Sequence, residues 1–365
     1  MTRNEHHAGL AERRLANQLL TTRGLEQAAD VVRSLGAVQA QDYAGAKWAL
    51  AQRMRHATDA SIERELSAGH ILRTHVLRPT WHFVAPADIR WMLALTGPRV
   101  NQAMAYHGRV NELTPSIIRR SNDAIAKALS GGKHLTRTEL GVALSRARIR
   151  NTSGQRLAHL VMRAELDAIV CSGVRRGNQF TYALLDERVP PAELIERDDA
   201  LLRLARRYFS TRGPATARDF AWWSGLAMSD VKRALQIAGP EIEKIALGED
   251  VMWFIPSRSP KRVPSAHLLP NYDEYFIGYK NRNAIGERLG HVKAVIGGDA
   301  RVSNVVVVDG QLVGGWKRTV DKKRIIVDIV LWCRLTAAEK GRVATAGQAY
   351  SRFVDGPCEI RGLGA

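Results

Sequence analysis

Two glutamines one residue apart stand out among the polar side chains of this sequence. Gln39 and Gln41 flank Ala40 in the stretch GAVQAQDYAG, and Asp42 follows directly. In an extended segment residues i and i+2 point to the same side, so both amides would face one space while Ala40 packs behind them. The same pattern also fits two amides that only satisfy backbone groups near a helix end. The sequence therefore offers a paired-amide site and a structural alternative.

The chemistry open to two amides is narrow. A glutamine amide does not accept a proton at neutral pH, so it cannot by itself activate water against a stable bond. Two amide carbonyls can still position a water molecule and stabilise developing positive charge if the bond is already labile. Asp42 is a reserve candidate for a base or charge partner, although it would point away from Gln41. His82 is a candidate to hydrogen-bond near the same pocket, with a purely structural histidine as the alternative.

Other catalytic motifs are missing from the sequence. It contains no GxSxG, Walker loop, HExxH, paired-cysteine zinc spacing or glycine-rich dinucleotide turn followed by an acid. Cys171, Cys333 and Cys358 are far apart and odd in number, which excludes a disulfide framework and a CxxC metal pair. We therefore expect neither a metal nor a cofactor.

The chain of 365 residues is strongly basic. Its 54 Lys and Arg against 36 Asp and Glu give a net charge of +18, which attracts polyanions. Nucleic acid is the expected partner, and arginine enrichment from a GC-rich genome is the alternative. No stretch approaches the about 20 uncharged apolar residues of a membrane helix. The N-terminus lacks the apolar core of a signal peptide, so we expect a cytoplasmic, nucleoid-associated protein with no membrane partner.

The chain repeats one local layout of a capped helix, a second helix and a hairpin of two short apolar strands, which is the winged-helix pattern. Thr136-Arg-Thr-Glu139 and Thr216-Ala-Arg-Asp219 cap the first helix of two copies, and Ser153 and Ser229 are the expected N-caps of the second helix. The helix after Ser153 is the candidate recognition helix of its copy. A looser third copy has helices over 10–20, 25–35 and 61–68 and the strands ILRTHVL and TWHFVAP.

Beyond Pro264 the sequence changes to short β-rich runs split by glycines, which fits a small barrel. We therefore predict an α+β fold of tandem winged-helix units followed by a small C-terminal β-barrel. The predicted boundaries are residues 1–115 for the unit with the glutamines, 116–195 and 196–258 for the next two, and 259–365 for the barrel. The alternative is an α+β protein in which helices and hairpins alternate by chance.

Four segments, in order between residues 36 and 318, carry a resemblance to a known family: GAVQAQD, RPTWHFV, LLPNYDEYFIGYKNR and VVVVDGQLVGGWKR. They resemble the winged-helix DNA-binding family that includes the AlkZ and YcaQ interstrand-crosslink DNA glycosylases. The resemblance implies a concave basic surface on double-stranded DNA. It also implies that Gln39 and Gln41 are the catalytic pair, since they match the Gln-aliphatic-Gln motif of the AlkZ branch. The YcaQ branch carries Asp at the second of these positions.

The activity that the resemblance implies is hydrolysis of the N-glycosidic bond of N7-alkylguanine, without a cofactor and without lyase activity. A guanine alkylated at N7 is cationic, so it leaves as a neutral base without a general acid. A crosslinked guanine cannot swing out freely, so the site must reach the sugar from the groove. The role would be DNA repair or self-resistance to an alkylating natural product, performed by a monomer. Two alternatives stay open: a winged-helix transcriptional regulator, and a lyase that uses a lysine such as Lys47.

Basic residues at three places are candidates for contact with the DNA backbone. They lie in the turn of the second hairpin, in the YDEYFIGYKNR stretch and in a hairpin beyond Trp316: Arg175, Arg176, Lys280, Arg282, Lys317, Arg318, Lys322, Lys323 and Arg324. The last hairpin could equally be a solvated sheet edge guarded by its charges. The aromatic residues Tyr272, Tyr275 and Phe276 could equally be core.

Overall fold

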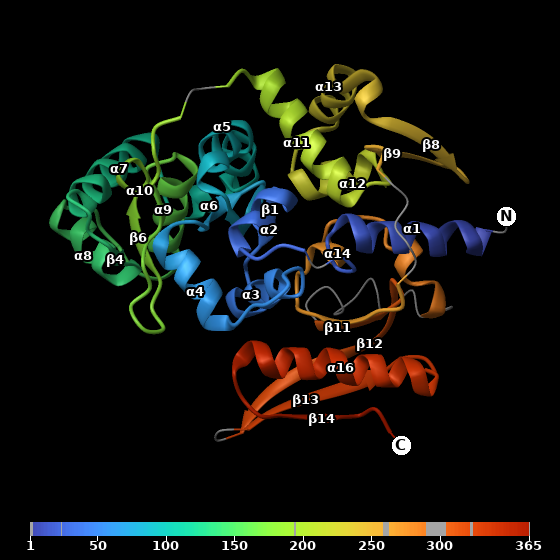
Figure 1. Cartoon of the computed structure of the whole chain (residues 1–365). Coiled ribbons are helices and arrows are strands. Elements are labelled where there is room, and N and C mark those ends of the chain that lie inside the picture. Colours follow the sequence, from blue (N-terminus) through green and yellow to red (C-terminus); the bar gives the residue numbers. More distant parts are fainter. Residues whose placement is uncertain are drawn as a thin grey trace.

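The computed structural model describes residues 3–22, 24–192, 195–257, 263–289, 304–321 and 324–364, and for 3–8 and 320–321 only the backbone. After α1 (Arg3–Asn17), three segments share one order of elements: a helix, a short strand, two helices and a hairpin. In each segment the three strands form an antiparallel sheet whose last strand lies in the middle. Figure 1 shows these segments above a C-terminal sheet and its helix.

The elements of the three segments and of the connections between them have the following bounds. The first comprises α2 (Ala28–Leu35), β1 (Ala37–Gln39), α3 (Tyr43–Ala51), α4 (Asp59–Ala68), β2 (Leu72–Val76) and β3 (Arg78–Val84). After α5 (Pro86–Ala103) and α6 (Ala105–Val110), the second comprises α7 (Pro115–Leu129), β4 (Leu135–Thr136), α8 (Arg137–Arg146), α9 (Gly154–Leu166), β5 (Val170–Ser172), β6 (Thr181–Leu184) and the short α10 (Leu185–Arg188). The third comprises α11 (Arg197–Arg212), β7 (Ala215–Thr216), α12 (Ala217–Ser224), α13 (Met228–Ala238), the 3-10 turn η1 (Gly239–Glu241), β8 (Glu243–Leu247) and β9 (Asp250–Phe254).

The predicted helix starts are confirmed in part. Thr136 and Thr216 cap α8 and α12, each in a reciprocal capping box with the acid three residues later. Ser153 precedes α9 but makes no side-chain capping bond. The prediction for Ser229 is wrong, because α13 begins at Met228 after Ala227.

Helix α9, the candidate recognition helix, is largely covered. It packs against α5, α7 and α8 and buries seven of its residues, among them Leu157 and Leu160. Helix α5 comes close because position 97 is glycine, where a Cβ would lie 3.1 Å from the carbonyl oxygen of Leu166. Only the first turn, with Gln155, is exposed. Binding of α9 in a DNA groove therefore stays a prediction. The first turn is the part of the helix that is available for such contact.

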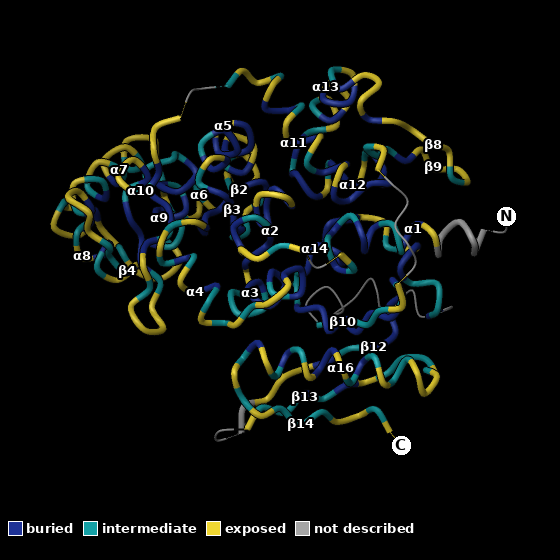
Figure 2. Tube along the Cα trace, viewed as in Figure 1, coloured by how far each residue is buried: buried dark blue, intermediate teal, exposed yellow. Residues whose placement is uncertain are grey.

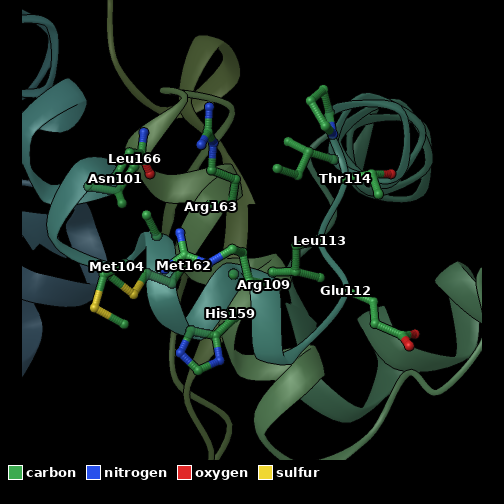
Figure 3. A pocket seen from close by; sticks show the side chains of 14 residues that line it. Asn101, Met104, Arg109, Glu112, Leu113, Thr114, His159, Met162, Arg163 and Leu166 are labelled. Carbon is green, nitrogen blue, oxygen red and sulfur yellow. The ribbon is translucent and has the colours of Figure 1, made fainter.

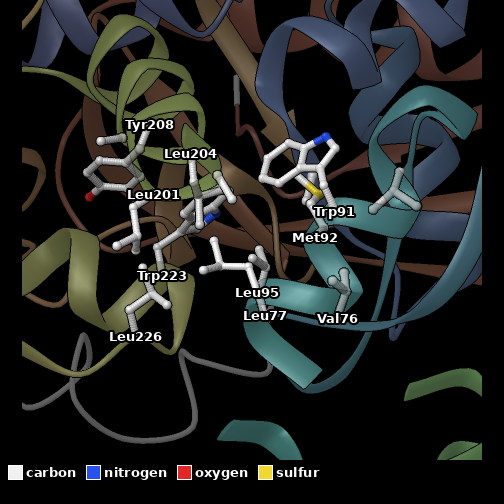
Figure 4. Close-up of a cluster of buried hydrophobic side chains, with 14 of the residues drawn as sticks. Val76, Leu77, Trp91, Met92, Leu95, Leu201, Leu204, Tyr208, Trp223 and Leu226 are labelled. Carbon is white, nitrogen blue, oxygen red and sulfur yellow. The ribbon is translucent and has the colours of Figure 1, made fainter. Parts of the chain in front are cut away.

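The sheet of the first segment is buried on both faces. Ala37, Leu72 and Val84 belong to a core shared with α5, α11 and α12, which Figure 4 shows in close-up. Val38 and Phe83 point the opposite way, into a core shared with the C-terminal sheet. In Figure 2, segments coloured as buried lie around β2 and β3. Strand β1 thus holds Gln39 on a sheet that is packed on both of its faces.

The C-terminal part is a curled five-stranded sheet in the order β10-β11-β12-β13-β14. It comprises β10 (Ala266–Leu269), α14 (Glu274–Ile277), the 3-10 turns η2 (Asn283–Ile285) and η3 (Glu287–Leu289), β11 (Asn304–Val308), β12 (Gln311–Asp321), β13 (Arg324–Leu331), α16 (Ala337–Val354) and β14 (Cys358–Arg361). A β-bulge between Val306 and Val307 bends the sheet. Within the described residues β10 does not pair with β14, so closure into a barrel stays a prediction, whereas the predicted α+β class is confirmed.

In the part of the chain that the structure describes, no helix has both the length and the apolar character needed to cross a bilayer.

Candidate active site

Gln39 and Gln41 lie at the end of β1, where the core meets the surface. The residue opposite Gln39 on β3 is His82, and the backbone N of Ala40 donates to the carbonyl oxygen of Trp81 at 2.7 Å. This hydrogen bond continues the pairing of β1 with β3 by one residue, and the backbone then bends at Gln41. Ala40 is fully buried in the core behind them. Gln39 is 6% exposed, whereas Gln41 is an exposed residue.

A partly buried arginine holds the side chain of Gln39. Nη2 of Arg78, the first residue of β3, donates to Oε1 of Gln39 at 2.8 Å. Burial lowers the pKa of Arg78, although the nearby carboxylate of Glu274 acts in the opposite direction. Because a guanidinium group only donates, the oxygen of the Gln39 amide must face Arg78 and its NH2 group must face away.

The carboxylate of Glu274 holds the backbone of Gln39. Its Oε1 accepts a hydrogen bond from the backbone N of Gln39 at 2.9 Å. Its Oε2 accepts from Nη2 of Arg212 at 2.6 Å and from Nε1 of Trp223 at 2.8 Å. Arg212 also donates to the carbonyl oxygen of Ala37 at 3.2 Å. The side chains of Glu274 and Arg212 have no exposed surface, so α11, α12 and α14 all anchor β1 through one buried ion pair.

His82 is completely buried beside Gln39, and it also lies opposite Thr74 on β2. Its Nδ1 lies 2.9 Å from the carbonyl oxygen of Thr80, which makes Nδ1 the protonated nitrogen. Burial, and then the charge of Arg78, hold the pKa of His82 well below its usual value. Nε2 of His82 and Oγ1 of Thr74 are buried without a hydrogen-bond partner among the described residues. The predicted histidine therefore lies at the site, as a neutral ring with a free acceptor.

Asp42 has a structural role at the start of α3. Its Oδ1 accepts from the backbone N of Gly45 at 3.0 Å, which makes it the N-cap. A Cβ at position 45 would lie 2.5 Å from Oδ2 of Asp42, so glycine lets this carboxylate lie close against the first turn of α3. The predicted hairpin residue Arg318 lies near this cap and donates to the hydroxyl of Tyr350 at 2.9 Å. Burial opposes the charged form of Arg318, but Tyr350 and the Asp42 carboxylate raise the pKa of Arg318 above its usual value.

Lys47 is held in ion pairs. Its Nζ lies 2.8 Å from Oδ2 of Asp59 and 2.8 Å from Oε2 of Glu63, and its side chain is 5% exposed. Formation of a Schiff base requires a neutral and accessible amine. The environment of Lys47 therefore does not suit a lyase nucleophile.

The two arginines of the second hairpin turn are engaged within the chain. Nη1 of Arg175 lies 3.3 Å from Oε2 of Glu63, and its guanidinium carbon lies 4.8 Å from the centroid of the Tyr43 ring. Arg176 pairs with Glu139, the capping acid of α8. DNA contact by this turn stays a prediction, and it would have to compete with both ion pairs.

The remaining basic candidates are spread over two places. Lys280 is exposed, whereas Nε of Arg282 donates to the carbonyl oxygen of Phe276 at 2.8 Å. Phe276 and Tyr275 are core residues, as the alternative interpretation of their stretch held. On the C-terminal hairpin, Lys317 and Arg324 are exposed residues of β12 and β13. Lys322 and Lys323 lie outside the described residues.

A cavity of about 690 Å³ lies elsewhere in the molecule, between α5, α6, α7 and α9. Figure 3 shows Met104, Leu113, Met162 and Leu166 in its wall, with Arg109 among the polar side chains around them. No residue of the glutamine site lines it, so the cavity is separate from that site.

Sequence reasoning missed the three charged residues that hold Gln39. Arg78 and Glu274 lie inside the segments RPTWHFV and LLPNYDEYFIGYKNR, but neither was singled out. Arg212 and Glu274 are 62 residues apart, and a buried ion pair leaves no periodic pattern in a sequence. An acidic residue inside an otherwise apolar stretch, such as Glu274 beside Tyr275, is the one signal that could have pointed to them.

A family model described as DNA glycosylase AlkZ-like matches residues 32–353. The chain therefore belongs to the AlkZ-like family of DNA glycosylases, which confirms the resemblance drawn from the four segments and makes it a DNA glycosylase.

Both the sequence comparison and the structural comparison find AlkZ of Streptomyces sahachiroi. The chain is 25% identical over 331 residues to a protein described as an interstrand DNA cross-link repair glycosylase. The aligned region covers 86% of this chain and 88% of that protein. The chain also matches the solved structure of the DNA glycosylase AlkZ with a TM-score of 0.81 at 21% identity, over 97% of this chain and 99% of the other. The structural likeness shows that the two chains share a fold.

Proposed function

We propose that this protein hydrolyses the N-glycosidic bond of N7-alkylguanine in double-stranded DNA and thereby unhooks interstrand crosslinks. Gln39 and Gln41 are the catalytic residues, no cofactor takes part, and the product is an abasic site. The observation that carries the proposal is the anchoring of the Gln39 amide by Arg78 and of its backbone by Glu274. Gln39 is held by two charged side chains, the partly exposed Arg78 and the fully buried Glu274. This arrangement fits a role in catalysis better than a role in satisfying nearby backbone groups.

The chemistry of the site fits a cationic leaving group. The amides and the neutral ring of His82 include no strong acid or base. An N7-alkylated guanine needs neither, because cleavage of the bond to the sugar returns an electron pair to the base and cancels its positive charge. The site then has only to place a water molecule and to tolerate positive charge on the sugar. An unmodified guanine would need a proton from the enzyme, so it should not be a substrate.

The binding mode that we propose follows the repeated layout of the chain. Residues 1–115, 116–195 and 196–258 are winged-helix units, and residues 259–365 are a small barrel, which together contact damaged duplex as a monomer. The exposed residues Lys280 and Lys317 are the readiest partners for phosphates, since Arg324 pairs with Glu359 and the other described candidates also have partners within the chain. The large positive net charge supports this mode through release of counterions.

The experiment that tests this function is a single-turnover incubation in EDTA. The substrates are a duplex with one N7-methylguanine, a duplex with one N7-linked crosslink and an undamaged duplex, each treated with alkali afterwards. We expect strand breaks that form only after alkali, on the first two substrates alone. Salt-sensitive binding without release of any base would contradict the proposal and would support a DNA-binding regulator instead. Breaks before alkali would indicate lyase activity.

A further inference from the structure

We propose that the two glutamines have different roles, in which Arg78 fixes Gln39 as a hydrogen-bond donor to the attacking water and Gln41 supplies the acceptor. Arg78 is then a positioning residue that acts through Gln39. This inference rests on the proposed function and deepens it. It also departs from the expectation that two equivalent carbonyls hold the water.

The orientation of the Gln39 amide follows from its neighbour. Arg78 has no acceptor, so only Oε1 of Gln39 can meet its Nη2 at 2.8 Å. One of the two lone pairs of this oxygen is therefore engaged with a cation. The oxygen is also a poor stabiliser of a second positive charge, because the guanidinium repels that charge. The oxygen of Gln39 therefore faces Arg78, and the NH2 side of the amide faces the reacting sugar.

The other side of the same amide carries two N–H groups. His82, the residue opposite on β3, is neutral and keeps its Nε2 lone pair without a partner among the described residues. It can accept one of these N–H groups, which leaves the second for a small molecule. Since Gln39 is only 6% exposed, its accessible surface suits a water molecule rather than a nucleobase.

Gln41 differs in each of these respects. It is exposed, so the Gln41 amide can turn its oxygen toward the substrate. A water molecule that accepts from Nε2–H of Gln39 and donates to Oε1 of Gln41 keeps one lone pair for C1′ of the sugar. As the oxygen–C1′ bond forms, the C1′–N9 bond breaks and its electron pair neutralises the alkylated base. The surplus proton of the water passes to solvent.

Exchange of each glutamine for glutamate separates the two roles. A carboxylate at position 39 can still pair with Arg78 but has no N–H to give, so Gln39→Glu should lose about 100-fold in single-turnover rate, the same loss that we expect for Gln39→Ala. Gln41→Glu keeps an acceptor and adds negative charge near the sugar, so it should stay within about 10-fold of wild type. The assignment would be overturned if Gln39→Glu and Gln41→Glu lost the same fraction of the single-turnover rate. It would also be overturned if Gln39→Glu kept the rate and Gln41→Glu lost it.

Arg78 is tested by a pair of variants. Arg78→Lys keeps a charged donor and should restore a substantial part of the rate that Arg78→Met loses, while the DNA dissociation constant of both stays near that of wild type. A loss of DNA affinity with an unchanged rate at saturation would instead make Arg78 a DNA-binding residue. Circular dichroism of each variant identifies a failure to fold, and Gln39→Glu, which keeps the shape of the side chain, tests the proposal independently of Arg78.

A measurement without catalysis completes the test. In protein labelled with 15N at glutamine side chains, the NH2 resonances of Gln39 and Gln41 are assigned by their loss in Gln39→Glu and Gln41→Glu. Arg78→Lys should shift the Gln39 resonances and leave those of Gln41 in place. Gln39 resonances that do not respond to Arg78→Lys would overturn the proposal. If wild-type protein releases no base, the proposed function fails, and these spectra still decide how the amide is held.

Discussion

Replacement of Glu274 by glutamine is the most informative single change in the support of the site. It keeps the shape of the side chain and removes its charge, which leaves Arg212 as a buried cation without a counterion. Both side chains have 0% exposed surface, and removal of one partner from such a pair costs about 3–5 kcal/mol. The new NH2 group also faces donors, so at least one of Gln39 N, Arg212 and Trp223 loses its acceptor.

We expect Glu274→Gln to lower the free energy of unfolding by about 3–5 kcal/mol in urea denaturation followed by tryptophan fluorescence. Glu249→Gln is the matched control, because Glu249 is exposed in the turn between β8 and β9, and it should change stability by no more than about 0.5 kcal/mol. The excision rate of Glu274→Gln should also fall, because the Gln39 backbone loses its anchor. Stability within about 1 kcal/mol of wild type would refute the argument that this pair is desolvated and holds β1.

Three further predictions concern residues around the site. Asp42→Ala should lower the free energy of unfolding by about 1 kcal/mol through loss of the α3 cap and should leave the excision rate nearly unchanged; a large loss of rate would return Asp42 to the catalytic residues. Wild-type protein should form no DNA adduct that borohydride can trap, because the ammonium of Lys47 is held by two carboxylates, and an adduct lost in Lys47→Gln would contradict this. The Arg176 side chain and the Thr136 backbone lower the pKa of Glu139 to about 2, below the usual 4.5. The stabilisation from this pair is therefore complete above pH 4.5 and lost as the pH falls toward 2, and Arg176→Gln should raise the midpoint of the Glu139 carboxyl in an NMR titration.

The sequence predicted those parts of the fold that local chemistry specifies. The capping boxes at Thr136 and Thr216 and the apolar strands of the first hairpin involve residues close together in the chain, so their patterns are visible without a structure. Helix α5 escaped prediction because it is apolar on most sides and contains Pro98. The burial of β1 on both faces depends on the C-terminal sheet, which no local pattern reveals.

In the candidate site, too, contacts between neighbouring segments could be predicted and contacts with distant elements could not. His82 lies opposite Gln39, as expected for residues on adjacent extended segments, whereas the pairing of the Gln39 and Gln41 amides at one site stays a prediction. Asp42 directly precedes α3, so its position in the sequence is compatible with an N-cap, a role that the sequence analysis did not consider. The ion pairs of Arg175 and Arg176 depend on side chains from α4 and α8, so their charges looked free in the sequence when they are not.

The central claim is that the glutamine pair performs the cleavage and does not merely support the fold. The most direct test is the single-turnover rate of N7-methylguanine release by wild type, Gln39→Ala and Gln41→Ala at saturating protein, with the DNA dissociation constant of each. We predict that both variants lose about 100-fold in rate while their affinity for DNA stays close to that of wild type. Unchanged rates in both variants, or losses that follow DNA affinity or folding, would contradict the claim and make the pair structural.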